Sequence, residues 1–477
     1  MRQTLLWIAA LTASVVADPL TTIPLYRRSN DGFIKASADE LDSGVLGGKV
    51  LIGTPPQEFT MAFDTNTGFS WVRGSRCKSE NCLDRCTYYS RRSETAVSTG
   101  QKLKVKYGEA CVETSIYLDN VEFGGVSVEN MPFGGAYRMT GFDQGFDGYL
   151  GLGRSVDFNK THIYSSAAQG LAKRDLPASS FVTNAYQQGS GMQSAQFGMV
   201  TTSSSDNGFG SDGTAGNTTP STPNDNQQPQ QPQPLPVGNN TQPALPTDGA
   251  QQPQQPNDNQ NQQQPQHPEQ GDEITSGGFG FFKRHYDEPA GYLILGGIDK
   301  SAIQGDIAYI DLVDSSSGSA NWEVPISLVR FEMDLILQQK KNAKALISTS
   351  QNFISMPYDQ ADIFHEVFGG KFQESSKTYK VKCSKIKDMP RLKLYLGDWA
   401  VEIPPQYWTR VIDAPTDCCA TRIARGESDR DWILGSSFTN LFYTTFDPVE
   451  EKLGLALKKG QKDDGLKLVD KSHLLDN

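Results

Sequence analysis

The sequence predicts a mainly β fold in two lobes, interrupted by one long disordered insertion. Short strands of alternating apolar and polar residues, such as GGKVLIG and FTMAF, are separated by Gly, Pro and Asn turns, and helical patterns are brief. A motif is repeated, because the same number of residues separates Asp64 from Gly151 as separates Ser348 from Gly435. Between the two copies, a stretch rich in Gln, Pro and Asn has almost no apolar residue, so burial cannot offset the entropy cost of ordering it.

The first seventeen residues have the pattern of a signal peptide, with Arg2 ahead of an apolar run and small residues before a cleavage site between Ala17 and Asp18. This run is too short to span a membrane, and no later segment approaches the roughly 18 to 20 apolar residues that a span requires. We therefore expect a secreted, extracellular protein. A net charge of -11 and a pI near 5.1 repel phosphate groups and anionic lipid, so neither nucleic acid nor a membrane is an expected partner.

The insertion covers residues 201–278 and contains glycosylation sequons at Asn217 and Asn239, while a third sequon lies at Asn159 in the folded part. A strand-like sequence, GYLILGGID, follows soon after it, which indicates an insertion within one fold rather than a boundary between domains. The expected divisions are an N-terminal β lobe over 47–200, a C-terminal β lobe over 279–457 and a polar tail over 458–477.

The cysteine count fits the oxidising compartment that a signal peptide implies. Seven cysteines are present, and an odd number leaves at least one unpaired or bonded to another chain. A zinc site is the competing interpretation, but the five histidines are scattered and no paired CxxC spacing occurs. We therefore expect no metal and no other cofactor.

Five stretches of the sequence resemble, in order, the motifs of the pepsin-like aspartic proteases. They are IGTPPQEFTMAFDTNTGFSWV, YGEACVETSIYLDNVEFGGVSVENMPFG, FDGYLGLG, GYLILGGID and WILGSSFTNLFYTTFDPVEEKLGLA. The resemblance covers the chain from about Gly47 to Ala456 apart from the insertion. It implies the pepsin-like acid protease fold, in which two β lobes flank a long peptide-binding cleft and each lobe supplies one catalytic aspartate.

Catalysis in such a site needs two acids. Two carboxyl groups close together share one proton, so that one acts as general base on a water while the other donates a proton to the scissile carbonyl. The resemblance makes Asp64 the first acid, in a family motif Asp-Thr-Gly that reads Asp64-Thr65-Asn66 here. The second motif reads Ser348-Thr349-Ser350, and a serine cannot ionise at working pH. The sequence therefore predicts that the second acid is lost.

The resemblance also assigns roles to the neighbours of these positions. Thr65 and Thr349 match the threonines that join the two lobes by hydrogen bonds beneath the site. Asn66 and Ser350 replace glycines, so we expect their side chains to crowd the site. Tyr107 matches the tyrosine of the mobile flap, and the residues that follow it bring Glu109 and Cys111 where the family usually has small residues.

The resemblance implies disulfides as well. Cys77 and Cys82 match a small loop after the first motif, and Cys383 is expected to bond to Cys418 or Cys419 in the second lobe, of which we take Cys418. Cys86 and Cys111 are then left, and a bond between them would tie the flap to the preceding loop and stiffen it.

Residues 18–46 form a segment about half as long as the family's inhibitory pro-segment. The text IPLYRR resembles the opening strand of that segment, and Arg27-Arg28 offers a dibasic processing site. A shortened pro-like segment fits a protein that has no activity to restrain.

These observations predict a secreted monomer with a pepsin fold that binds a peptide, a protein or a glycan through its cleft without cleaving it. One alternative is an active acid endopeptidase in which another carboxyl group, such as that of Asp359 or Glu109, compensates for Ser348. A second alternative is a matrix or cell-wall component in which the insertion is the functional part.

Overall fold

The computed structural model describes residues 26–29, 31–42, 44–83, 85–107, 110–142, 145–155, 178–202, 289–313, 321–375 and 378–474. The chain divides into two compact units, and every described residue belongs to the unit formed by Met1–Thr214 and Glu288–Asn477. The predicted signal peptide, the three sequons and all but the first two residues of the predicted insertion lie outside the described residues.

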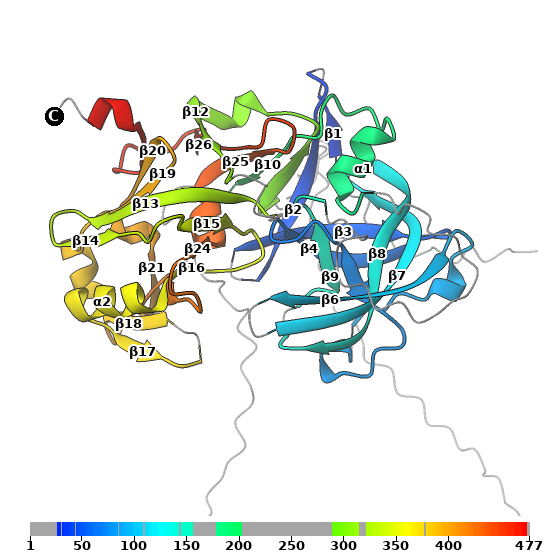
Figure 1. Ribbon diagram of the computed structural model, residues 1–477, viewed down its shortest axis with the longest axis horizontal. Helices are drawn as coiled ribbons and strands as arrows, with labels where there is room; N and C mark the ends of the chain where they lie inside the picture. The colour runs from blue at the N-terminus through cyan, green and yellow to red at the C-terminus, as the bar shows by residue number, and fades with distance from the viewer. Residues whose placement is uncertain are drawn as a thin grey trace, which may run out of the picture. The chain divides into compact units, whose positions relative to one another are not determined.

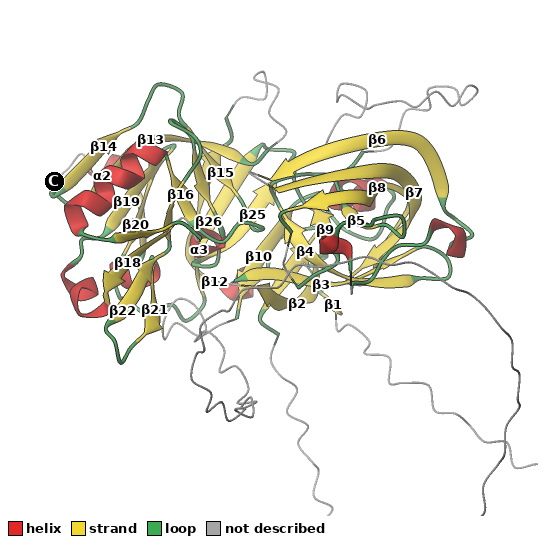
Figure 2. Cartoon of the chain, turned by 90° about the horizontal axis from the view of Figure 1, so that it is seen from below, coloured by secondary structure: helices red, strands yellow, loops and turns green. Residues whose placement is uncertain are grey.

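Strands make up most of the described chain, with only short α-helices, as Figure 2 shows. The predicted mainly β, two-lobed fold is therefore confirmed. The elements of the first half are β1 (Tyr26–Arg28), β2 (Ile34–Asp42), β3 (Val45–Ile52), β4 (Gln57–Asp64), β5 (Trp71–Arg73), β6 (Val97–Tyr107), β7 (Ala110–Phe123), β8 (Val126–Thr140), β9 (Gly148–Gly151), α1 (Phe181–Gln187) and β10 (Phe197–Thr201).

The second half begins after the gap in the described residues. Its elements are β11 (Gly291–Leu295), β12 (Ile303–Asp311), β13 (Glu323–Phe331), β14 (Leu335–Gln338), β15 (Lys344–Ile347), β16 (Ile354–Met356), α2 (Tyr358–Phe368), β17 (Lys371–Gln373), β18 (Thr378–Lys382), β19 (Leu392–Leu396), β20 (Trp399–Ile403), β21 (Thr409–Asp413), β22 (Cys418–Thr421), β23 (Ile423–Arg425), β24 (Trp432–Leu434), α3 (Ser436–Thr439), β25 (Phe442–Asp447), β26 (Lys452–Lys458) and β27 (Lys467–Asp470). No helix among the described residues is long and apolar enough to cross a bilayer.

The largest sheet joins the two halves of the chain. Its strands run in the order β12-β26-β25-β10-β11-β2-β3-β4-β9-β5-β8-β7-β6, so strands from the end of the sequence pair with strands from its beginning (Figure 1). The second half adds a sheet in the order β23-β16-β24-β15-β13-β19-β20-β27 and a small sheet in the order β17-β18-β22-β21. The main apolar core contains residues from both halves, which makes the halves one packed unit.

Strand β2 comes from the predicted pro-like segment, yet it is part of the large sheet. It pairs with β11 and with β3, and the side chains of Ile34, Ala36 and Ala38 on one face are buried. Strand β1 pairs with β2 in turn, so the structure places residues from Tyr26 onward in the fold, ahead of the predicted lobe boundary at residue 47. The apolar residues at every second position of β2 are the signal for a half-buried strand. The predicted polar tail likewise contains β27, which pairs with β20.

The predicted repeat is visible in the strand register around the two motifs. Strand β4 pairs in parallel with β9, placing Asp64 opposite Gly151, and β15 pairs in parallel with β24, placing Ile347 opposite Leu434. The glycines are needed for close approach, because an added Cβ at Gly151 would lie 2.7 Å from the Phe69 backbone and one at Gly435 would lie 2.5 Å from the Gln351 carbonyl oxygen. The same backbone arrangement thus carries both motifs to the junction of the halves.

Candidate active site

The two threonines that follow β4 and β15 join the halves by reciprocal hydrogen bonds. Thr65 Oγ1 donates to the Ile347 carbonyl oxygen at 2.8 Å, and Thr349 Oγ1 donates to the Phe63 carbonyl oxygen at 2.7 Å. Each hydroxyl also accepts the backbone N–H of the other threonine, at 3.1 and 3.2 Å. All these atoms are buried, so the four bonds fix the ends of the two strands against each other.

Asp64 is fully buried at this junction, with an exposed fraction of 0%. Its Oδ1 accepts hydrogen bonds from the Asn66 backbone N–H at 2.9 Å and from the Ser350 hydroxyl at 2.6 Å, while Oδ2 has no hydrogen-bond partner among the described residues. Burial raises the pKa of Asp64 to about 6, although the hydrogen bonds from Ser350 and Asn66 oppose this rise. The carboxyl group is therefore neutral in acidic solution.

Ser348 follows β15 as Asp64 ends β4, at the equivalent position of the second motif, and is also fully buried. Its backbone N–H donates to the Leu434 carbonyl oxygen at 3.0 Å, and its Oγ lies 3.4 Å from the Ser350 Oγ. Ser350 therefore lies between Ser348 and Asp64 and supplies the hydroxyl that bonds to the acid. We expected the side chain at position 350 only to crowd the site, whereas it is the direct partner of Asp64.

No other described carboxyl group forms a hydrogen bond with Asp64. The described hydrogen bonds to Asp64 come from a backbone amide and a hydroxyl, and no acidic group is among the causes that shift its pKa. Asp359 is exposed at the start of α2, where its Oδ1 accepts the Gln360 backbone N–H at 2.9 Å. Glu109 lies outside the described residues. Within the described part of the chain, no group of three His, Cys, Asp or Glu residues could hold a metal.

The hairpin of β6 and β7 brings Tyr107 to Asp64. Tyr107 pairs with Ala110 where the hairpin turns, and its hydroxyl accepts a hydrogen bond from Trp71 Nε1 at 2.9 Å. Burial and the nearby Asp64 charge raise the pKa of Tyr107 well above its usual value. The Tyr107 hydroxyl also lowers the pKa of Asp64, although the contact between the hydroxyl and the carboxyl group does not have the geometry of a full hydrogen bond. The hairpin thus closes over the buried acid.

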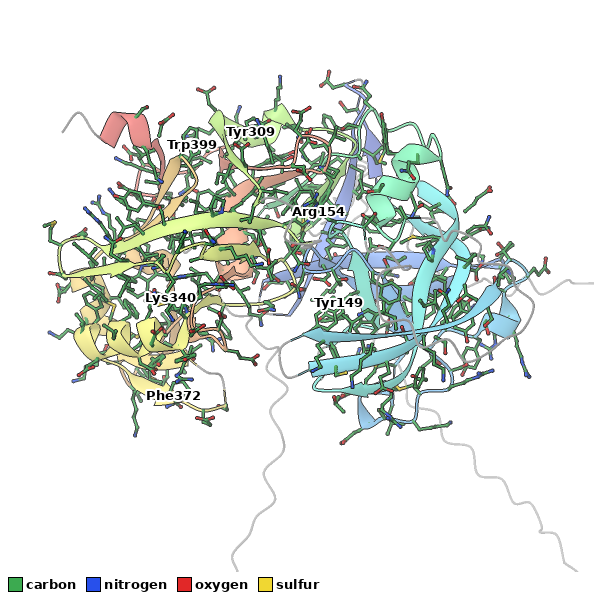
Figure 3. The ribbon with its side chains drawn as sticks, in the orientation of Figure 1. Tyr149, Arg154, Tyr309, Lys340, Phe372 and Trp399 are labelled. Atoms are coloured by element: carbon green, nitrogen blue, oxygen red, sulfur yellow. A yellow bond between two sulfur atoms is a disulfide. The ribbon has the colours of Figure 1, made fainter. Side chains whose placement is uncertain are left out.

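An aromatic cluster holds this hairpin in its closed position. Tyr107 stacks on Tyr149 with ring centroids 5.1 Å apart and an interplanar angle of 16°, and the Phe142 ring meets Tyr107 edge-on at 5.6 Å. Phe146 packs edge-on against Tyr149 at 5.1 Å. Figure 3 shows Tyr149 among the side chains beside β6. The motif FDGYLGLG alone predicts no role for Tyr149; its position in β9, directly beside the strand that ends in Asp64, is the signal for one.

A family model supports the resemblance that the site suggests. The model of the eukaryotic aspartyl proteases matches residues 46–207 and 259–458, which is most of the chain.

The chain belongs to the eukaryotic aspartyl protease family.

Relatives within this family match with modest identity. Gastricsin from Cavia porcellus is 21% identical over 86% of this chain and 79% of its own length, and cathepsin D from Homo sapiens is 24% identical over the same shares. Vacuolar protease A from Arthroderma otae is 36% identical, but over only 28% of this chain and 35% of its own. The family match includes the segments that contain Asp64 and Ser348.

The disulfides of this aspartyl protease chain differ from two of the predicted pairings. Cys77 and Cys82 are bonded, as the resemblance implies. Cys383 is bonded to Cys419, not to Cys418, which is free. Neighbouring residues of strand β22 point to opposite faces of the sheet, so only one of two adjacent cysteines can face Cys383.

The predicted bond between Cys86 and Cys111 is absent, and both thiols are free. Cys111 lies in β7, where it pairs with Thr140 and Lys106. Cys86 is exposed in a loop that is held by a hydrogen bond from its backbone N–H to Asp147 Oδ1. The flap of this protein is therefore held by aromatic contacts and not by a disulfide.

Proposed function

We propose that this aspartyl protease homologue is a secreted pseudoprotease, which binds a peptide or an extended protein segment in its cleft without hydrolysing it. The observation that carries the proposal is the partner of Asp64, which is the Ser350 hydroxyl at 2.6 Å instead of a second carboxyl group. The signal-peptide pattern of the first seventeen residues supports secretion.

The titration of Asp64 explains why one acid is not enough. Below a pH of about 6 the carboxyl group is protonated, so it has a proton to donate but cannot activate a water. Above this pH it is a carboxylate that can accept a proton, but no described acid is present to protonate the scissile carbonyl. General acid or base assistance contributes ~10² to 10⁴ in rate, and the loss of one of two coupled groups costs nearly as much as the loss of both.

Binding without catalysis remains feasible because one strand of the hairpin lies at the edge of the large sheet, as far as the described residues show it. Strand β6 is the last strand in the order of the large sheet, so its outer N–H and C=O groups can pair with an extended peptide. To admit a peptide beside Asp64, Tyr107 must leave the stack with Tyr149 and the hydrogen bond from Trp71. Binding is therefore coupled to opening of the hairpin.

A proteolysis assay tests the absence of catalysis. The secreted full-length protein is incubated with a denatured protein substrate from about pH 2 to about pH 7, beside the Asp64→Ala variant. We expect no difference between the two proteins at any pH. Acid proteolysis that disappears in Asp64→Ala would overturn the proposal, and the Glu109→Gln variant would then show whether Glu109 is the compensating acid.

A binding assay tests the positive half of the proposal. Peptides are selected from a random library on the immobilised protein, and their affinities are compared between the wild type and Tyr149→Ala, which removes the ring that holds Tyr107. We expect tighter binding to Tyr149→Ala, because less free energy is needed to open the hairpin. Peptides that bind both proteins equally would place the binding surface outside the cleft.

A further inference from the structure

A concave surface separate from the Asp64 site lies on the small sheet of the C-terminal half, which is formed by β17, β18, β22 and β21. It is a cavity of about 470 Å³, and four lysines line it: Lys371, Lys380, Lys382 and Lys385. None of the residues that form the Asp64 site belongs to its lining. Figure 3 labels Phe372 of β17, which marks the position of this sheet below α2.

The four lysines of the cavity lie close together and outnumber the one acidic residue of the lining. Lys371 is directly opposite Lys380 across β17 and β18, an arrangement of like charges that destabilises a strand pair. Lys382 lies two residues further along β18 and so shares a face with Lys380. None of the four lysines forms an ion pair with an acid in the described part of the chain. This local excess of positive charge contrasts with the net charge of -11 for the whole protein.

One carboxylate lies in the lining, and it already has partners. Both Asp417 oxygens accept hydrogen bonds from Ser384, one from its backbone N–H and one from its hydroxyl, each at 2.7 Å. These bonds lower the pKa of Asp417, and Lys382 adds a smaller effect in the same direction. Asp417 therefore balances part of the charge of one lysine and leaves the lining positive overall.

The rest of the lining is mostly apolar. Phe368, Val381 and Met389 contribute to it, and the rings of Phe368 and Phe331 pack together with centroids 5.6 Å apart. The aliphatic parts of lysine side chains add to such a surface while their ammonium groups remain in water. Small-molecule sites typically have volumes of about 300 to 1,000 Å³, with apolar walls and a few polar groups that orient the ligand.

We propose that this cavity binds a small amphipathic anion, which has one carboxylate or sulfate head and a short alkyl or aromatic body. The head lies among Lys371, Lys380 and Lys382, where it relieves the repulsion between the opposed lysines. The body lies against Phe368 and Met389. This site is separate from the proposed peptide cleft and does not depend on the pseudoprotease proposal.

Cys418 provides a local probe of occupancy. It is a free, half-buried thiol in the cavity lining, while Cys86 is a free, exposed thiol in the other half of the chain. The full-length protein is treated with iodoacetamide at increasing concentrations of decanoate, and the alkylation of each cysteine is followed by mass spectrometry. We expect the Cys418 rate to fall about tenfold when decanoate reaches about ten times its Kd, with no change at Cys86.

Two comparison ligands separate the contributions of head and body. Acetate has the charged head without the body, and decan-1-ol has the body without the charge. We expect each to protect Cys418 far more weakly than decanoate does. Equal protection by decan-1-ol, or an unchanged Cys418 rate throughout the decanoate titration, would overturn the proposal.

A matched pair of variants tests the role of the lysines. Replacing Lys371, Lys380 and Lys382 together by Gln should raise the Kd for decanoate about tenfold, since each exposed charge pair contributes modestly. The control replaces exposed lysines outside the lining by Gln, at Lys300, Lys341 and Lys387, and should leave the Kd unchanged. Equal Kd values for the two triple variants would contradict the proposed site.

Discussion

The two halves of the site have the same backbone and different side-chain chemistry. In the first half, the Thr60 N–H donates to Asp147 Oδ2 at 2.8 Å, and in the second the Lys344 N–H donates to Asp431 Oδ1 at 3.3 Å, at the equivalent place. The threonines and the close-packed glycines also correspond. The two motifs differ at the position that is Asp64 in the first and Ser348 in the second, so the same backbone arrangement carries an acid in one half and a hydroxyl in the other.

The side chains on the strands beside the two motifs differ as well. Tyr149, opposite Ala62 on β9, stacks on Tyr107, while the equivalent position opposite Leu346 on β24 is Ile433. The aromatic cluster thus belongs to the first half. This difference indicates that the hydrogen bonds and packing of the fold do not require two carboxyl groups that share a proton. The stability of the fold and the titration of the site can therefore be tested separately.

The threonine cross-link should give the largest effect. Thr65→Ala removes a donor to Ile347 and an acceptor for Thr349 N–H, and buried groups without partners cost ~1 to 3 kcal/mol each. We expect a loss of about 2 to 5 kcal/mol in the free energy of unfolding, measured with urea, and a similar loss for Thr349→Ala. Thr65→Ser, which keeps the hydroxyl, is the control. A small loss in either alanine variant would mean that the halves are joined mainly by the shared sheet.

Asp64→Asn tests whether ionisation of the buried Asp64 carboxyl group destabilises the fold. The folded-state pKa of Asp64 is about 6, above its unfolded value of 3.8, so its favourable contribution is complete below pH 3.8 and is lost as the pH rises through 6. Near neutral pH, Asp64→Asn should therefore be more stable than the wild type by about 3 kcal/mol, and the difference should vanish in acid. Asp359→Asn, at an exposed acid, is the matched control and should show no such difference.

Gly151→Ala and Gly435→Ala compare the two copies directly. Each added methyl group would meet backbone atoms at 2.7 or 2.5 Å, and overpacking of this kind costs ~1 to 3 kcal/mol. We expect similar losses of unfolding free energy from the two variants. Gly145→Ala is the control, because the nearest atom to its added Cβ is the end of the Arg85 side chain at 3.7 Å. Losses that differ widely between Gly151 and Gly435 would break the proposed equivalence of the halves.

Sequence patterns gave the β class, the repeat and the positions of both motifs, because alternation and spacing are local properties of the chain. They did not reveal that the Ser350 hydroxyl bonds to Asp64, since a replaced glycine does not specify where the new side chain points. The bonding of Cys419 instead of Cys418 depends on which face of β22 meets Cys383, and strand register sets this face. The role of β2 depends on its pairing with β11, which lies on the far side of the insertion.

Ser350→Ala should have the smallest effect of these variants, because it removes one hydrogen bond between the two halves of the site. The Ser350 hydroxyl donates to Asp64 and opposes the rise that burial causes in the Asp64 pKa. Its removal should therefore raise that pKa above about 6. Carboxyl-carbon NMR of selectively labelled protein measures this shift. A lower pKa in Ser350→Ala would show that another group becomes the partner of Asp64.

The same NMR titration on the wild type tests the absence of a second acid most directly. An isolated carboxyl group titrates in a single step, whereas two carboxyl groups that share a proton titrate in two steps that belong to the pair. We predict one step for Asp64, with a pKa of about 6. Two separated steps in the Asp64 signal would contradict the account, because they would require a second acid in contact with it.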